Sequence, residues 1–206
     1  GADRGSTMSE MVVVETPEMR ERTRLGMWLF LASEIMFFAG FIGAYVVLRT
    51  IQPATTAGHV NPFDDLSHLN KWLALVNTVV LITSSLTMAL AVAAAHRGDN
   101  KAIAKNILFT MVLGVTFLVI KGFEYNAKFQ VDHFPSTSVM YACYFTMTGF
   151  HGLHVLVGIA VLFFIWLFAL RGRYSVNRNV GVEVTGLYWH LVDVIWIFLF
   201  PIIYLL

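Results

Sequence analysis

The sequence predicts an all-α integral membrane protein with five transmembrane helices. Its composition, its long apolar stretches and the placement of its basic residues all indicate this class. Of the 206 residues, 57% are hydrophobic and only 13% are charged, whereas soluble domains carry about 25% charged residues. An ordinary soluble enzyme and a disordered chain are therefore excluded. A net charge of +1 gives no basic surface for nucleic acid, and the single Cys143 excludes an internal disulfide.

Two parts are expected along the chain. Residues 1–24 are predicted to form a polar cytoplasmic tail without a signal-peptide core, and residues 1–7, which precede Met8, are left out of the fold prediction. Residues 25–206 are predicted to form one transmembrane domain with apolar stretches at about 25–48, 72–95, 103–125, 138–170 and 182–206. About 20 apolar residues cross a membrane as a helix, so each stretch suffices for one span. The fourth stretch is the longest and is expected to tilt or to protrude.

Helices are expected rather than strands because backbone groups that face lipid must pair within their own segment, and these stretches are too long for barrel strands. The orientation follows from the Lys and Arg residues, since cytoplasmic segments carry an excess of them. Four lie on the side of the first and third connections, at Arg49, Lys71, Lys121 and Lys128, and the other ten lie on the side of the N-terminal tail. The N-terminus is therefore predicted in the cytoplasm and the C-terminus outside.

Glu34 is an ionisable residue within the first stretch, about 13 Å from its start at 1.5 Å per residue. A lone carboxylate is costly at that depth. Two interpretations stay open. Glu34 is either a proton-exchanging or partner-binding carboxyl, or a neutral acid hydrogen-bonded between helices.

Two further polar pairs lie three residues apart within apolar stretches. His151 and His154 share a helix face, but two residues do not supply the three or four ligands of a zinc site, so cross-helix hydrogen bonds are the favoured interpretation. Asp193 is expected to accept a hydrogen bond from His190, from Trp189 or from a partner helix, because pairing lowers the cost of a buried acid.

Aromatic and small residues complete the apolar stretches. Tyr188, Trp189 and Trp196 are either buried or interfacial anchors. Small residues recur four apart and predict close helix packing, within the bundle or against another membrane subunit; the pairs are Ala39 with Gly43, Gly40 with Ala44, Ala89 with Ala93, and Ala91 with Ala95. The sequence contains no phosphate loop, no CxxC pair and no nucleophile elbow, so the chain alone predicts no catalytic chemistry.

Three motifs, in this order and spacing, resemble subunit III of the haem–copper respiratory oxidases. They are GMWLFLASEIMFF at 26–38, TGFHGLHV at 148–155 and YWHLVDVIW at 188–196. Weaker similarities are GFEY at 122–125 and Glu183 before the last stretch. The resemblance covers roughly residues 25–204.

The resemblance implies a V-shaped bundle with a lipid-lined cleft, in a five-helix form that lacks the first two of seven helices. It implies that this chain has no catalytic residue and no metal, that haem and copper reside in partner subunits, and that the chain packs against oxidase subunits I and II and structural phospholipids. Glu34 would lie in the lipid-lined region, and the remaining site residues would be buried motif residues; these are His151, His154, His190, Asp193, Glu124 and Glu183. Lys121 stands where the family often has Gln.

The expected function is that of a non-catalytic subunit III of a bacterial aa3- or caa3-type cytochrome c oxidase, a proton-pumping translocase of the bacterial inner membrane. The subunit would stabilise subunit I and support proton and oxygen delivery. A quinol oxidase subunit III and an accessory subunit of a nitric oxide reductase are alternatives. Two other classes stay open: a small proton-coupled transporter using Glu34, and a haem-binding cytochrome using His151 and His190. Membership of a respiratory supercomplex is also open.

Overall fold

The computed structural model describes residues 16–51, 71–129 and 139–204. Within them the chain forms five helices: α1 (Pro17–Ile51), α2 (Lys71–His96), α3 (Asn100–Phe129), α4 (Val139–Leu170) and α5 (Val180–Tyr204). All five are long and apolar enough to cross a membrane, so the predicted all-α membrane fold is confirmed. The tail before residue 16, the first and third connections and the last two residues of the fifth stretch lie outside the described residues.

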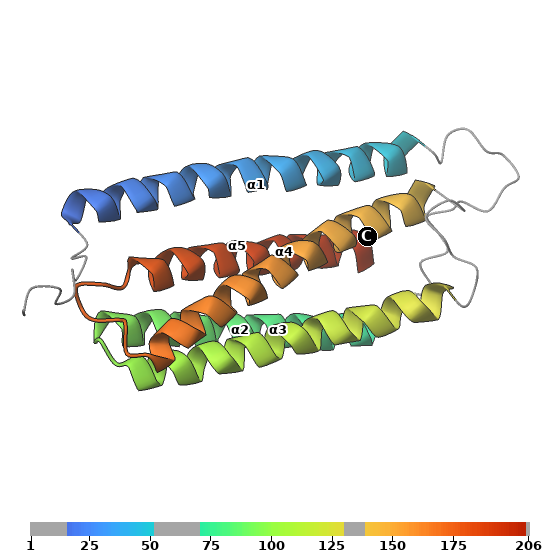
Figure 1. Ribbon diagram of the computed structural model, residues 1–206. Coiled ribbons are helices and arrows are strands. Elements are labelled where there is room, and N and C mark those ends of the chain that lie inside the picture. Colours follow the sequence, from blue (N-terminus) through green and yellow to red (C-terminus); the bar gives the residue numbers. More distant parts are fainter. Residues whose placement is uncertain (1–15, 52–70, 130–138, 205–206) are drawn as a thin grey trace, which may run out of the picture.

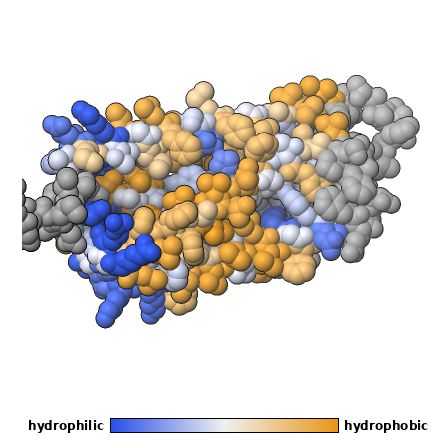
Figure 2. All heavy atoms as spheres, in the orientation of Figure 1, coloured by the Kyte–Doolittle hydropathy of each residue, from blue (hydrophilic) through white to orange (hydrophobic). Residues whose placement is uncertain are grey.

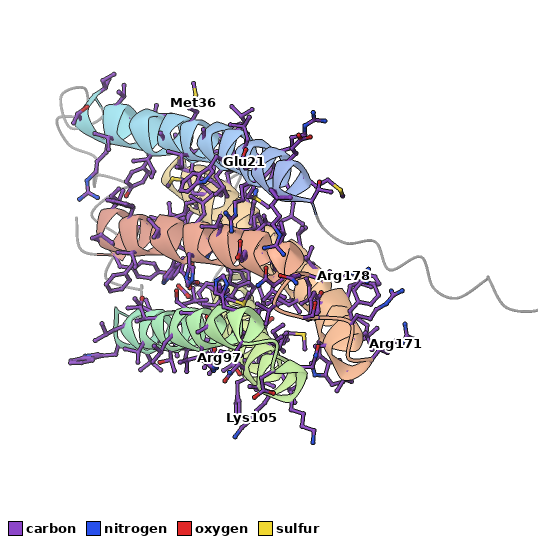
Figure 3. The ribbon with its side chains drawn as sticks, turned by 90° about the vertical axis from the view of Figure 1, so that its left-hand side faces the viewer. Glu21, Met36, Arg97, Lys105, Arg171 and Arg178 are labelled. Atoms are coloured by element: carbon purple, nitrogen blue, oxygen red, sulfur yellow. The ribbon has the colours of Figure 1, made fainter. Side chains whose placement is uncertain are left out.

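Helix α5 is the centre of the bundle. It packs against α1, α2 and α4, while α2 packs against α3 and α3 against α4. Figures 1 and 3 show α5 between α1 on one side and the α2–α3 pair on the other. In the most apolar stretch of α5, half of the residues are therefore buried, which is the largest share among the five spans. The third sequence motif lies on this central helix.

Helix α1 begins eight residues before the predicted start of the first stretch. Thr16 caps it, because its hydroxyl oxygen accepts a hydrogen bond from the backbone N–H of Met19 at 3.3 Å, and Pro17 occupies the first helical position. Both are preferred at helix starts. The two polar turns that follow are helical as well, so hydropathy alone placed the boundary too late.

Two glycines end helices at the same end of the bundle. Gly98 and Gly172 have φ angles of 72° and 67°, the left-handed conformation that glycine adopts without steric cost. At Gly98 the amides of residues 98 and 99 bond back to the carbonyls of Ala95 and Ala94, which is the Schellman arrangement. Asp99 then caps α3 by accepting hydrogen bonds from the N–H groups of Lys101 and Ala102. This tight turn at residues 97–99 holds α2 against α3.

Polar residues gather at that end of the molecule. In Figure 2 blue atoms cluster there and an orange belt covers the middle of the bundle. Viewed from this end, Glu21, Arg97, Lys105, Arg171 and Arg178 come from α1, α3 and the two turns (Figure 3). This distribution agrees with the division of Lys and Arg residues from which the orientation was predicted. The assignment of that end to the cytoplasm stays a prediction.

The small residues of the two helices differ in role. Ala91 and Ala95 on α2 are fully buried, as expected for packing within the bundle. A Cβ added at Gly40 or Gly43 on α1 would meet no atom within 4 Å. Of the two expected alternatives, Gly40 and Gly43 therefore do not serve close packing within the described part of the chain, and contact with another membrane chain stays a prediction.

Candidate functional site

Glu34 pairs with His154 across the interface of α1 and α4. One carboxylate oxygen lies 2.9 Å from Nε2 of His154, and both side chains are more than four-fifths buried. The other ring nitrogen, Nδ1, lies 2.7 Å from the backbone carbonyl oxygen of Phe150. A carbonyl only accepts, so Nδ1 donates there. The bond between Glu34 and Nε2 consequently holds a single proton, shared by the acid and the imidazole.

Phenylalanines of α1 and α4 pack beside this pair. Phe38 packs edge-on against the His154 ring at 5.2 Å between centroids, while Phe37 and Phe41 both contact Phe150. Phe38, which is 2% exposed, therefore covers one side of the imidazole, and the other three rings join α1 to α4 beside the pair. Of the two interpretations of Glu34, its side chain has the geometry of an acid bonded between helices, and a role in proton exchange stays a prediction.

His151 does not share the surroundings of His154. Its ring lies 5.1 Å from the ring of Trp196 on α5 and 5.5 Å from that of Phe117 on α3. Neither ring nitrogen has a hydrogen-bond partner among the described residues, so the expected cross-helix bond is absent. No group of three or more His, Cys, Asp or Glu side chains that could hold a metal ion occurs in the described part of the chain.

The third motif binds α5 to α2 through three side-chain hydrogen bonds. Nε1 of Trp189 donates to the hydroxyl of Ser84 at 3.1 Å, and Nε1 of Trp196 donates to that of Thr78 at 3.0 Å. Nδ1 of His190 lies 2.6 Å from the Ser85 hydroxyl. Both tryptophans are only 1% exposed, so the interfacial-anchor alternative is wrong for them.

Asp193 does not pair with either of the two donors expected on its own helix. The residue is buried, but neither carboxylate oxygen has a hydrogen-bond partner within the described residues. Trp189 and His190, the two expected donors of this helix, bond instead to Ser84 and Ser85. Spacings of four and three residues place Trp189 and His190 near Asp193 on the helix, but the facing serines of α2 determine where their hydrogen bonds go.

Glu124 belongs to a buried network that the sequence analysis did not predict. Its carboxylate accepts hydrogen bonds from Lys121 at 2.8 Å, from the Tyr204 hydroxyl at 2.6 Å and from the Tyr144 hydroxyl at 2.9 Å. Lys121 also donates to the Tyr204 hydroxyl and lies 4.4 Å from the centre of the Trp196 ring. The spacing of Lys121 and Glu124 was a usable signal, whereas the tyrosines come from α4 and α5.

Glu183 ties three helices together at the polar end. One carboxylate oxygen accepts a hydrogen bond from the Arg24 guanidinium at 2.6 Å, and the other lies 3.5 Å from Nε2 of His96. Arg24 belongs to α1, His96 to α2 and Glu183 to α5. The sequence motifs indicated Glu183 but not its partners, because no local pattern relates residues that lie so far apart in the chain.

The fold and the site define a multi-pass helical membrane protein whose motif side chains mostly bond to neighbouring helices of the same bundle. The family model described as "Cytochrome c oxidase subunit III" matches residues 6–206. The chain belongs to this family, and it is therefore a subunit of an oxidase complex.

Curated relatives carry the same description. The protein named "Cytochrome c oxidase subunit 3" from Synechocystis sp. is 36% identical over 191 residues, which cover 92% of this chain and 77% of that protein. Proteins of the same name from Loxodonta africana and Bos taurus are 36% and 35% identical over 191 residues, covering 92% of this chain and 71% of each relative. The resemblance of the three motifs is thereby confirmed.

Proposed function

We propose that this chain is the non-catalytic subunit III of a bacterial aa3- or caa3-type cytochrome c oxidase in the bacterial inner membrane. The observation that carries the proposal is the use of its motif side chains. Glu34 with His154 and Trp189 with Ser84 bond helix to helix, so they support a rigid bundle. Haem and copper would reside in subunits I and II, and this chain would stabilise subunit I.

Lipid binding is part of this proposal. An apolar cavity of about 220 Å³ lies between α1, α4 and α5, lined by Met27, Phe30, Val157, Val161, Thr185 and Tyr188. Its walls suit an acyl chain and offer little for a polar substrate. Phospholipid held here, next to the Glu34–His154 pair on the same two helices, would support oxygen and proton delivery to the catalytic subunit.

A proton-coupled transporter is the candidate of another class. It would need a lane of ionisable groups across the bundle. The Lys121–Glu124 ion pair and the Glu34–His154 pair lie on different helices and each is closed by its own partners. This pairing favours the oxidase subunit.

Purification of the complex through a tag on this chain tests the proposal. We expect a larger chain with haem and copper to co-purify, identified by absorption spectrum and mass spectrometry, and the preparation to oxidise cytochrome c with uptake of oxygen and release of protons. Oxidation of quinol but not of cytochrome c would establish the quinol oxidase alternative. Recovery of the chain without any haem- and copper-bearing partner would overturn the proposal.

A further inference from the structure

His151 lies in the interior of the arrangement formed by α2, α3, α4 and α5. The side chain belongs to α4, and its ring packs against Phe117 of α3 at 5.5 Å and against Trp196 of α5 at 5.1 Å between ring centroids. Trp196 in turn bonds to Thr78 of α2 through Nε1. His151 is only 1% exposed. Neither a lipid headgroup nor a side chain of another chain therefore reaches its ring nitrogens.

Both ring nitrogens of His151 need hydrogen-bond partners. A neutral imidazole has one N–H group and one nitrogen lone pair, and neither nitrogen has a partner among the described residues. A buried polar atom without a partner costs free energy, and most buried polar groups in proteins are paired. The N–H group can point to the face of an aromatic ring, but the lone pair requires a hydrogen-bond donor.

The donors around Trp196 are engaged elsewhere. Its own Nε1 donates to a hydroxyl of α2 at 3.0 Å. Lys121, whose Nζ lies 4.4 Å from the centre of the Trp196 ring, donates to Glu124 at 2.8 Å and to the Tyr204 hydroxyl at 2.7 Å. A further donor for His151 must therefore be small enough to enter a closed interior, and it must both donate and accept. Water meets these requirements.

Asn77 brings a second unpaired polar atom to the same place. Its Nδ2 lies 3.5 Å from the backbone carbonyl oxygen of Phe117, the residue whose ring contacts His151. Oδ1 of Asn77 has no partner within the described residues, and the side chain is fully buried on α2. An amide oxygen only accepts, so it also needs a donor. Buried water typically makes about three hydrogen bonds to such otherwise unpaired groups.

We propose that His151 binds ordered water inside the bundle, with the water donating to the lone-pair nitrogen and accepting from the N–H group, and with Oδ1 of Asn77 as a further acceptor. The site is separate from the Glu34–His154 pair, whose imidazole nitrogens are both bonded within the protein. The inference goes beyond the proposed function, because it concerns the interior of this chain and holds whichever complex contains it. It gives a reason for a histidine where packing alone favours an apolar ring.

Hydroxyl-radical labelling by X-ray pulses tests the site in the purified complex, because X-rays convert bound water into radicals that oxidise the side chains beside it. We expect Trp196 to be oxidised severalfold faster than Trp189, as measured by tandem mass spectrometry. Trp189 is the matched reference, since it is equally buried on the same helix and also bonds to α2 through Nε1. Its ring is packed closely against Gly114 and Gly158. Equal oxidation of the two tryptophans would overturn the proposal.

Two variants assign the water to its binding groups. His151→Phe keeps an aromatic ring against Phe117 and removes both nitrogens, so the oxidation rate of Trp196 should fall to that of Trp189. Asn77→Leu removes the amide oxygen and should lower the rate as well. An unchanged rate in His151→Phe would refute binding by this histidine, and an unchanged rate in Asn77→Leu would exclude Asn77 from the site.

A measurement on the unchanged protein remains decisive if either variant fails to fold. Solid-state NMR of a complex with isotope-labelled histidine detects the transfer of magnetisation from water protons to ring nitrogens. We expect this transfer at His151 and not at His154, which lies three residues further along α4 and bonds to Glu34 and to the carbonyl of Phe150. Absence of transfer at His151 would show that its ring is dry and would overturn the proposal.

Discussion

At the scale of single residues, Glu34 and His154 form the most distinctive pair of the molecule. Since Nδ1 of His154 bonds to the carbonyl of Phe150, the contact between Nε2 and Glu34 holds one proton. The pair is either a neutral acid with a neutral imidazole or a carboxylate with an imidazolium. Both forms hold α1 against α4, and both leave a proton buried between helices of a subunit that we propose to be non-catalytic.

Glu34→Gln is therefore expected to leave assembly intact and to lower turnover only mildly. The amide can still donate to Nε2 of His154, so the loss of stability should be about 1 kcal/mol, the scale of one hydrogen bond. Subunit content, the unfolding temperature in detergent and the oxygen consumption rate measure these effects. Glu34→Leu, which cannot bond to Nε2, should be less stable. Near-complete loss of oxygen reduction in a fully assembled Glu34→Gln complex would show that this carboxyl is essential for catalysis.

At the scale of helices, Trp189 on α5 sets the spacing of its neighbours. A Cβ added at Gly114 on α3 would lie 2.8 Å from its indole, and one added at Gly158 on α4 would lie 2.9 Å from it. The indole is thus in close contact with two glycines from different helices, while its Nε1 bonds to Ser84 on α2. One buried side chain therefore determines how closely three helices approach α5.

Gly158→Ala is expected to destabilise the protein by about 1–3 kcal/mol, because a rigid, fully buried ring cannot move aside and overpacking costs energy of this size. Gly122→Ala is the matched control, since a Cβ there would meet no atom within 4 Å. Thermal unfolding in detergent, followed by circular dichroism, compares the two variants. Equal unfolding temperatures would show that the bundle relaxes around Trp189.

The Lys121–Glu124 network joins α3 to α4 and α5 through the two tyrosines. Removing one partner of a buried ion pair leaves the other charge uncompensated, at a cost of about 3–5 kcal/mol. We expect this loss for Lys121→Met and substantial recovery for the double variant Lys121→Met/Glu124→Gln, which carries no buried charge at this site. A double-mutant cycle of unfolding free energies measures the coupling. A Lys121→Met protein as stable as the unchanged one would rule out a structural role for the pair.

At the scale of the whole molecule, the bundle has one polar end and an apolar belt (Figure 2). The turns after α2 and α4 and the start of α1 lie at the same end (Figure 1). Most of the basic residues used to predict the orientation belong to these segments or to the first turns of α3. These segments share one end because successive spans run in opposite directions.

The predicted orientation has a direct test. An epitope tag at the N-terminus should be digested by protease in inverted membrane vesicles and protected in right-side-out vesicles, because basic segments stay in the cytoplasm. A tag at the C-terminus should show the reverse pattern and serves as the internal control. Digestion of the N-terminal tag only in right-side-out vesicles would invert the assignment of the two ends.

The number, the type and the approximate limits of the spans could be predicted from the sequence, because hydropathy and length depend only on neighbouring residues. The sequence also determined the family, because the three motifs are contiguous. The start of α1 could also have been predicted from the sequence, because Thr16 and Pro17 form a local signal for the beginning of a helix.

Which polar side chains contact one another could not be predicted from the sequence and is seen only in the folded bundle. His154 bonds to Glu34 while His151, three residues away, is enclosed by Phe117 and Trp196. The two donors expected for Asp193, Trp189 and His190, bond instead to serines of another helix. In each case the choice depends on the rotation and depth at which one helix faces another. That geometry follows from packing over the whole bundle, so no short stretch of sequence contains it.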